Sequence, residues 1–359
     1  MMVRRAGPAT DLPSAPAMLV LVGGMLGAGK TTLVLEACRR LTARGQRVGV
    51  VTNDQGSNLV DTAVAARAGI EVAEIAGGCF CCRLSQLVDA LGTLERQAVD
   101  VIFAEPVGSC VDITATVINP LLRDFPGRFR VAPFTVLVDP ARARELAAKG
   151  ADPDVSFLFR HQIEEADLVC LTKRDKGIDA VAGSLVGHHI SARTGEGVDA
   201  WLDLVLGGTL AVGRTSLDVD YRRYAAAEAA LAWLNWQVDV MLATAMSPAT
   251  VVGVLTERLG RALRAAGQRV VHVKVLDQTP AGYVRAHLCS AEDESVPEGM
   301  LDASPTMQHH LLVNARAIGD PQVLSAAVAE CIRDLGRARS KKLEAFRPLP
   351  PRPERRLPL

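Results

Sequence analysis

The sequence has few aromatic residues, no net charge and no long apolar run. Aromatic residues make up only 4% of the 359 residues, so rings contribute little to a core. Basic and acidic residues number 40 each, and a chain without basic excess does not resemble a general nucleic-acid binder. The apolar stretch 17–22 is far too short to span a bilayer, and nothing before it resembles a secretory leader. We therefore expect a cytoplasmic protein with no nucleic-acid or membrane partner.

Short apolar runs alternate with amphipathic stretches through the first two hundred residues. Unbroken apolar strands separated by helices predict a parallel sheet that is covered on both faces, as in α/β proteins. The expected strands are Met18–Val22, Val48–Thr52, Val72–Ile75, Val99–Ala104, Phe134–Asp139, Leu168–Thr172 and Val186–Ser191.

The second half of the chain has a different pattern. Its expected order is β-α-β-β-β-α, which predicts a smaller α+β domain with an antiparallel sheet, and Asp320 is expected to cap the last helix. The predicted organisation is a disordered lead-in (1–16), a P-loop domain (17–207), a linker (208–223), an α+β domain (224–337) and a disordered basic, proline-rich tail (338–359).

A phosphate-binding loop follows the first expected strand. The segment Gly24–Thr31 matches G-x-x-x-x-G-K-[ST] and opens a predicted helix. Backbone N–H groups of such a loop point at phosphate oxygens, Lys30 can reach the β- and γ-phosphates, and the Thr31 hydroxyl can bind Mg²⁺. The expected phosphate-binding residues are Gly24, Gly27, Ala28, Gly29, Lys30, Thr31 and Thr32.

Two later stretches favour guanine as the base. Thr172-Lys173-Arg174-Asp175 is similar to the N-K-x-D motif, in which the aspartate accepts hydrogen bonds from guanine and the lysine stem packs on the ring. Ser191-Ala192 is similar to the start of the S-A-K motif, whose backbone donates to guanine O6. We therefore expect Lys173, Asp175, Ser191 and Ala192 to bind the base of GTP, with ATP as the alternative.

Three of the eight cysteines lie together at Cys79, Cys81 and Cys82, after Gly77-Gly78. Thiolates are soft ligands that favour Zn²⁺. Three of them in a tight turn leave one tetrahedral position open, which suits transfer of a metal better than storage. We predict a zinc site here, with Co²⁺ or another divalent metal as alternatives.

These motifs together resemble the CobW/HypB/UreG family of metallochaperone GTPases, and the CobW branch most closely. The family's C-x-C-C stands at 79–82, its E-x-x-G at 105–108, and its N-E-F-G switch reads Asn53-Asp54-Gln55-Gly56. The resemblance implies that Glu105 lies near Mg²⁺ or the attacking water and that Gly108 senses the γ-phosphate. It implies catalytic roles for Lys30, Glu105 and Asp54.

The resemblance implies a slow GTPase that delivers a metal to a client metalloprotein under nucleotide control. Two other functions stay open at this point. One is a GTPase that gates a cofactor-dependent enzyme, for example a cobalamin enzyme, without carrying metal. The other is a nucleotide-regulated scaffold. A homodimer is compatible with each of them.

Overall fold

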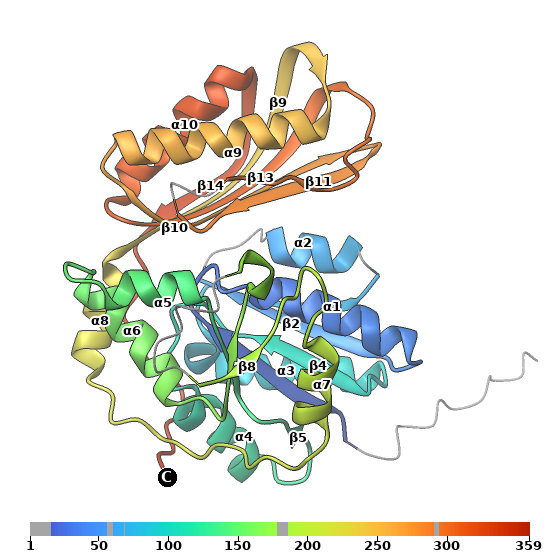
Figure 1. The fold of residues 1–359 in the computed structure, drawn as a ribbon, viewed down its shortest axis with the longest axis vertical. Coiled ribbons are helices and arrows are strands. Elements are labelled where there is room, and N and C mark those ends of the chain that lie inside the picture. Colours follow the sequence, from blue (N-terminus) through green and yellow to red (C-terminus); the bar gives the residue numbers. More distant parts are fainter. Residues whose placement is uncertain (1–15, 56–59, 68, 178–185, 291–293) are drawn as a thin grey trace, which may run out of the picture.

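The computed structural model describes residues 16–55, 60–67, 69–177, 186–290 and 294–359 (Figure 1). The predicted lead-in lies outside these residues except for Pro16. In the described part of the chain, no helix combines the length and the apolar character needed to cross a membrane.

The first sheet has eight strands, and all of their recorded pairings are parallel. Its order is β3-β2-β4-β1-β6-β7-β8, with β5 beside β1, so the predicted α/β fold with a parallel sheet is confirmed. The strands are β1 (Met18–Gly24), β2 (Val48–Asp54), β3 (Glu71–Ala76), β4 (Val101–Glu105), β5 (Arg130–Val131), β6 (Thr135–Val138), β7 (Leu168–Leu171) and β8 (His188–His189).

Helices cover both faces of this sheet. Alternate residues of β1 show why: Leu19 and Leu21 enter one buried cluster, whereas Val20 and Val22 enter another. The helices are α1 (Lys30–Ala43), α2 (Val60–Arg67), α3 (Leu84–Arg96), α4 (Asn119–Asp124), α5 (Pro140–Ala147), α6 (Pro153–Glu164) and α7 (Val198–Leu206).

The second sheet is antiparallel, with the order β12-β11-β10-β13-β9-β14. Two helices cover its outer face, and its other face looks towards the first domain (Figure 1). The Asp320 side chain accepts hydrogen bonds at the start of the last helix, as predicted. The elements are α8 (Tyr221–Ala229), β9 (Leu231–Met246), α9 (Pro248–Ala265), β10 (Arg269–Thr279), β11 (Gly282–Leu288), β12 (Glu298–Gly299), β13 (Thr306–Ile318), α10 (Pro321–Leu335) and β14 (Arg337–Phe346).

The tail differs from its prediction. Residues 337–346 form strand β14, which pairs with β9 from Arg337 opposite Met241 to Phe346 opposite Trp233. The prediction of disorder followed from the exposed, charged side chains. An edge strand needs few buried side chains, however, because its backbone ladder holds it to the sheet. The following residues return to the first domain, and the chain ends near α4 (Figure 1).

Candidate nucleotide and metal site

The phosphate loop joins β1 to α1. Gly24, Gly27 and Gly29 have φ angles of 126°, 83° and 98°, a region that residues with a side chain rarely adopt. The Lys30 side chain is buried, and its Nζ donates to the Gly24 carbonyl oxygen at 2.9 Å. The ammonium group therefore lies across the loop, where phosphates of a nucleotide would replace the carbonyl as its partner.

Thr31 and Glu105 meet beside this loop. The Thr31 hydroxyl lies 3.0 and 2.9 Å from the two carboxylate oxygens of Glu105, the last residue of β4. Hydroxyl and carboxylate oxygens are hard ligands that suit Mg²⁺ next to phosphates, so the residues present fit this ion. Ala28 and Thr32 also line the pocket, as does the Glu105–Gly108 loop.

Gly108 lies directly against the phosphate loop. A Cβ atom on this residue would come within 2.9 Å of both the Lys30 Nζ and the Leu26 amide nitrogen. Only glycine fits without a shift of these atoms. The expected γ-phosphate sensor is thus in contact with the residues that would hold that phosphate.

Asp54 has a partner that the sequence did not indicate. Its Oδ2 lies 2.8 Å from a guanidinium nitrogen of Arg316 on β13, in the second domain. Arg316 is buried and lies 4.1 Å from the centre of the Trp233 ring. Asp54 still lines the pocket, but it also ties the end of β2 to the second domain. A catalytic role for it stays a prediction.

The residues expected to bind the base lie together at the other end of the pocket. The Ser191 hydroxyl donates to the Asp175 carboxylate at 2.6 Å, and Lys173 pairs with Asp139 at 2.6 Å. The Thr172 hydroxyl donates to the Ala28 carbonyl at 2.9 Å, which fixes this segment to the phosphate loop. Of these, Thr172, Lys173 and Asp175 line the pocket together with Ala192.

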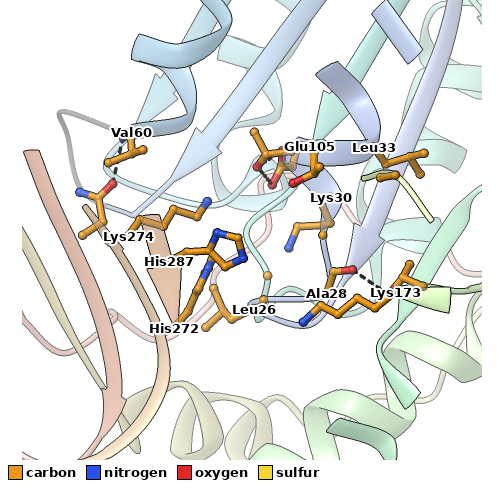
Figure 2. A pocket seen from close by; sticks show the side chains of 18 of the residues that line it. Leu26, Ala28, Lys30, Leu33, Val60, Glu105, Lys173, His272, Lys274 and His287 are labelled. Carbon is orange, nitrogen blue, oxygen red and sulfur yellow. Dashed lines mark hydrogen bonds between the residues drawn. The ribbon is translucent and has the colours of Figure 1, made fainter. Parts of the chain in front are cut away.

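Side chains of the second domain also line the pocket, and sequence analysis missed them. His272 and Lys274 come from β10, and Arg285 and His287 come from β11 (Figure 2). Burial lowers the pKa of His287 to about 4. Burial, together with neighbouring charges that begin with Lys274, also lowers the pKa of His272 well below its usual value. The sequence did contain a signal for these side chains. Residues two apart on a strand share a face, as His272 and Lys274 do on β10 and Arg285 and His287 do on β11.

The cysteine turn follows β3 and leads through the short 3-10 helix 80–83 into α3. The Cys79 sulfur lies 2.8 Å from that of Cys81 and 3.3 Å from that of Cys82, and the other two are 3.7 Å apart. All three lie within 4.8 Å of one another, so they can converge on one ion. Their number and softness fit Zn²⁺.

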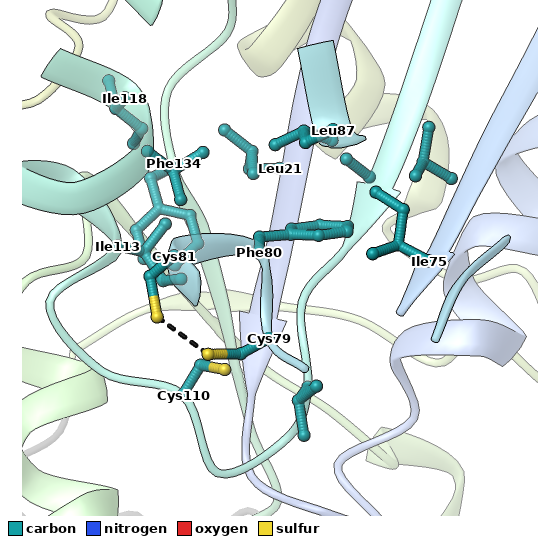
Figure 3. Close-up of a cluster of buried hydrophobic side chains, with 14 of the residues drawn as sticks. Leu21, Ile75, Cys79, Phe80, Cys81, Leu87, Cys110, Ile113, Ile118 and Phe134 are labelled. Carbon is teal, nitrogen blue, oxygen red and sulfur yellow. Dashed lines mark hydrogen bonds between the residues drawn. The ribbon is translucent and has the colours of Figure 1, made fainter. Parts of the chain in front are cut away.

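A fourth thiol, Cys110, joins this group. It follows Gly108 on the loop after β4, and its side chain contacts Cys79 (Figure 3). Hydrogen bonds, of which that from Cys110 has the largest effect, hold the pKa of Cys79 well below its usual value. The same bond and burial raise the pKa of Cys110. Sequence analysis missed Cys110 because it lies far from the C-x-C-C motif along the chain.

Asn53 connects the cysteine turn to the end of β2. Its amide nitrogen donates to the carbonyl oxygens of Ile75 at 3.0 Å and Gly78 at 2.7 Å, and its oxygen accepts from the Phe80 N–H at 3.0 Å. The neighbouring residue Asp54 lines the nucleotide pocket. Sequence analysis placed Asn53 in a switch but did not identify this contact.

The end of the chain covers the outer side of the cysteine turn. The Arg352 N–H lies 3.1 Å from the Cys82 sulfur, and the Glu354 N–H donates to the Cys81 carbonyl oxygen at 2.9 Å. The Glu354 carboxylate accepts from the Ser85 N–H at 2.8 Å, at the start of α3. Two arginines of the tail pair with Asp124 and Asp112 of the first domain.

Comparison with known proteins identifies the first domain. Residues 18–188 match the model of the CobW/HypB/UreG nucleotide-binding domain. This stretch of the first domain is similar to the nucleotide-binding domain of that family. The resemblance expected from the motifs is confirmed, and this family domain is the part of the chain that carries both the phosphate loop and the cysteine turn.

Two curated relatives of this CobW/HypB/UreG domain come from Escherichia coli (strain K12). The zinc chaperone YjiA is 26% identical over 171 residues, which are 45% of this chain and 50% of YjiA. The zinc chaperone YeiR is 30% identical over 164 residues, which are 44% of this chain and 46% of YeiR. The chain thus matches about half the length of each relative.

Solved structures show more distant likenesses. HypB from Helicobacter pylori in complex with nickel has a TM-score of 0.39 and 16% identity, over 54% of this chain and 86% of that chain. The Zn(II)-bound YjiA GTPase from E. coli has a TM-score of 0.31 and 14% identity, over 88% of this chain and 99% of that chain.

Proposed function

We propose that this protein is a GTP-hydrolysing metallochaperone that binds Zn²⁺, or a related divalent ion such as Co²⁺, at its cysteine turn and delivers it to a client metalloprotein under nucleotide control. The observation that carries the proposal is the pair of contacts that join the two sites. Asn53 and the loop from Glu105 to Cys110 each reach from the nucleotide pocket to the cysteine turn.

The nucleotide half of the proposal rests on the pocket. Lys30, Lys274 and Arg285 line a space that suits a triphosphate. Thr31 with Glu105 would hold Mg²⁺ there. Bound Mg²⁺ would neutralise phosphate charge. Glu105 would orient the water or the ion, and Gly108 would contact the γ-phosphate. Phosphoryl transfer depends on such positioning, so we expect slow hydrolysis until a client completes the site.

The metal half rests on the cluster of sulfur atoms and on the description of YjiA and YeiR as zinc chaperones. A single buried thiol can be explained by packing, because free cysteine behaves as a small apolar residue. Several thiols in contact at the end of one strand are better explained by a bound metal. Transfer to a client requires this cluster to be uncovered. The end of the chain, which lies over the cluster, continues from β14 of the second sheet.

The decisive experiment measures Zn²⁺ affinity by competition with a chelator, with and without a non-hydrolysable GTP analogue. We expect the analogue to shift the Zn²⁺ affinity by roughly five- to a hundredfold, and Zn²⁺ to shift the analogue's affinity by the same factor. Absence of any Zn²⁺ or Co²⁺ binding would sink the metallochaperone proposal and favour a GTPase that gates a cofactor enzyme. Binding without a shift would sink nucleotide control.

The base preference has a separate test. Asp175 and Ser191 are hydrogen-bonded to each other beside the pocket, so Asp175→Asn should reduce the preference for GTP over ATP. Arg174→Ala provides a control because this neighbour pairs with Glu196 instead. An unchanged preference in Asp175→Asn would remove Asp175 from base recognition.

A further inference from the structure

The loop that connects Glu105 to Cys110 lies between the two sites. At one end, Gly108 contacts the phosphate loop at Lys30. At the other end, the fully buried side chain of Cys110 contacts Cys79. Figure 3 shows the Cys110 sulfur beside the Cys79 sulfur, which in turn lies next to that of Cys81. A single short loop therefore reaches from the expected position of the γ-phosphate to the expected metal site.

Gln162 ties the two ends of this loop together. Its amide nitrogen donates to the carbonyl oxygens of both Gly108 and Cys110, at 3.0 Å each. The Cys110 N–H in turn donates to the Val107 carbonyl oxygen at 2.9 Å. Gly108 and Cys110 therefore share one hydrogen-bond partner, so we expect a displacement of Gly108 to reach Cys110.

Among the described residues, the sulfurs that all lie within 4.8 Å of one another are those of Cys79, Cys81 and Cys82, so a site with four sulfurs requires Cys110 to move towards this group. Zn–S bonds of about 2.3 Å in a tetrahedron place the sulfurs roughly 3.8 Å apart. The three sulfurs of the turn are 2.8 to 3.7 Å apart, so a small outward movement suffices to admit an ion. Cys110 contacts this group through Cys79.

We propose that Cys110 is the fourth thiolate ligand of the metal site, so that the γ-phosphate-sensing loop opens and closes the coordination of the ion. The proposal rests on the proposed function, because it assumes that the C-x-C-C turn binds metal. Each thiol that binds the ion releases its proton to solvent, so the closed site holds the divalent ion on four thiolates. Withdrawal of Cys110 leaves a three-thiolate site with one position for a client's ligand.

Other buried cysteines define the contrasting case. Cys38 on α1 and Cys170 on β7 are also fully buried, but both lie in the apolar cluster on the α1 side of the sheet. Burial raises the pKa of Cys38 to about 12, with no neighbouring thiol involved. Cys110 differs because its side chain meets another thiol at a candidate metal site.

The test uses the full chain, purified under reducing conditions and loaded with Zn²⁺ or Co²⁺ alone. X-ray absorption of the Zn²⁺ form counts the sulfur ligands in the unaltered protein, which avoids any folding defect of a variant. We expect four sulfurs. The Co²⁺ thiolate charge-transfer absorbance should fall by about a quarter in Cys110→Ser and in Cys110→Ala, and Zn²⁺ affinity should fall roughly a hundredfold. Cys38→Ser is the matched control and should change neither.

The possible outcomes separate this inference from the proposed function. Three sulfurs in the unaltered protein, with full absorbance in both Cys110 variants, would overturn the role of Cys110 and leave the proposed function intact. Failure of the unaltered protein to bind either metal would overturn both. Four sulfurs, reduced to three in a Cys110 variant, together with a smaller effect of the GTP analogue on Zn²⁺ affinity, would support the inference.

Discussion

The phosphate loop (Gly24–Thr31) and the cysteine turn (Gly77–Arg83) both connect a parallel strand to a helix of the first domain. The phosphate loop turns its polar groups into a pocket between the two domains. The cysteine turn directs its sulfurs inwards, and residues of the chain's own end lie over its outer side. A nucleotide can therefore enter one site directly, whereas a metal must displace something to enter or leave the other.

This contrast suits a protein whose two ligands have different requirements. In the proposed function, a nucleotide binds, is hydrolysed and leaves in each cycle. A metal ion on thiolates has to be retained until a client is present, because free thiolates and loosely held metal both react with other molecules. The connection through Asn53 and the loop 105–110 would allow the first cycle to control the second.

The largest expected effect separates the two sites. Lys30→Ala removes the ammonium group beside the expected phosphates, and loss of a buried charge partner of this kind should weaken GTP binding roughly a thousandfold. Zn²⁺ affinity without nucleotide should stay within twofold of the unaltered protein, as measured by chelator competition. Lys149→Ala, at an exposed position, is the control. A parallel loss of Zn²⁺ affinity would mean that the two sites are one folding unit.

A buried acid under the cysteine turn should make stability fall as pH rises. Burial raises the pKa of Glu228 on α8 to about 7 from an ordinary value of 4.5. The folded state then binds the proton more tightly than the unfolded chain does. The favourable contribution is fully present below pH 4.5 and is lost as pH rises through 7. The difference of about 2.5 units corresponds to roughly 3 kcal/mol of unfolding free energy.

Glu228→Gln should abolish that pH dependence. Urea unfolding at pH 5 and pH 8 measures the effect. Between these two pH values the unaltered protein should lose most of the unfolding free energy that Glu228 contributes, whereas the unfolding free energy of the variant should not fall for this reason. Glu257→Gln on α9, where the side chain is 68% exposed, should behave like the unaltered protein. Parallel pH profiles for Glu228→Gln and the unaltered protein would contradict the assignment.

The parallel sheet and the phosphate loop could be predicted because their determinants are local. Apolar runs indicate the buried strands. The spacing of Gly24, Gly29 and Lys30 identifies the phosphate loop within a few residues of sequence. The C-x-C-C turn was found for the same reason. Each of these features needs only its own segment of chain to be recognised.

The missing parts of the site are those that depend on tertiary contacts. Cys110 meets Cys79 only because β3 and β4 end at the same edge of the sheet, with β2 between them. Lys274 and Arg316 reach the pocket only because the second sheet turns one face towards the first domain. The tail was predicted to be disordered because its sequence is charged. Its order comes from backbone hydrogen bonds to β9, which the side chains of the tail do not indicate.

The next prediction concerns the link between the two sites. Asn53→Ala removes three buried hydrogen bonds that hold the cysteine turn to the end of β2. We expect Zn²⁺ affinity to fall about tenfold, which corresponds to the net free energy of one such hydrogen bond. We also expect the GTP analogue to lose most of its effect on Zn²⁺ affinity. Asn235→Ala also removes a buried amide, on β9, and controls for general loss of stability. An unchanged analogue effect would assign the coupling to the loop 105–110 alone.

The smallest effect tests the cover over the cysteine turn. Arg352 lies between Pro351 and Pro353, and its N–H bonds to the Cys82 sulfur. This bond favours the thiolate form of Cys82. With the bond present, the neighbouring Cys79 and burial still raise the pKa of Cys82 to about 11. Arg352→Pro removes that single N–H within a proline-rich segment, so transfer of Zn²⁺ to a chelator should become several-fold faster.

Arg352→Ala isolates the backbone from the side chain in this experiment. It keeps the N–H and removes only an exposed guanidinium, so stopped-flow transfer rates should match those of the unaltered protein. Equal acceleration in both variants would assign the effect to the charge of the tail. Equal and unchanged rates would mean that the ion leaves on the side of Cys110 and not on the side of the tail. The loop 105–110 would then be the segment that controls release of the metal ion in response to the nucleotide.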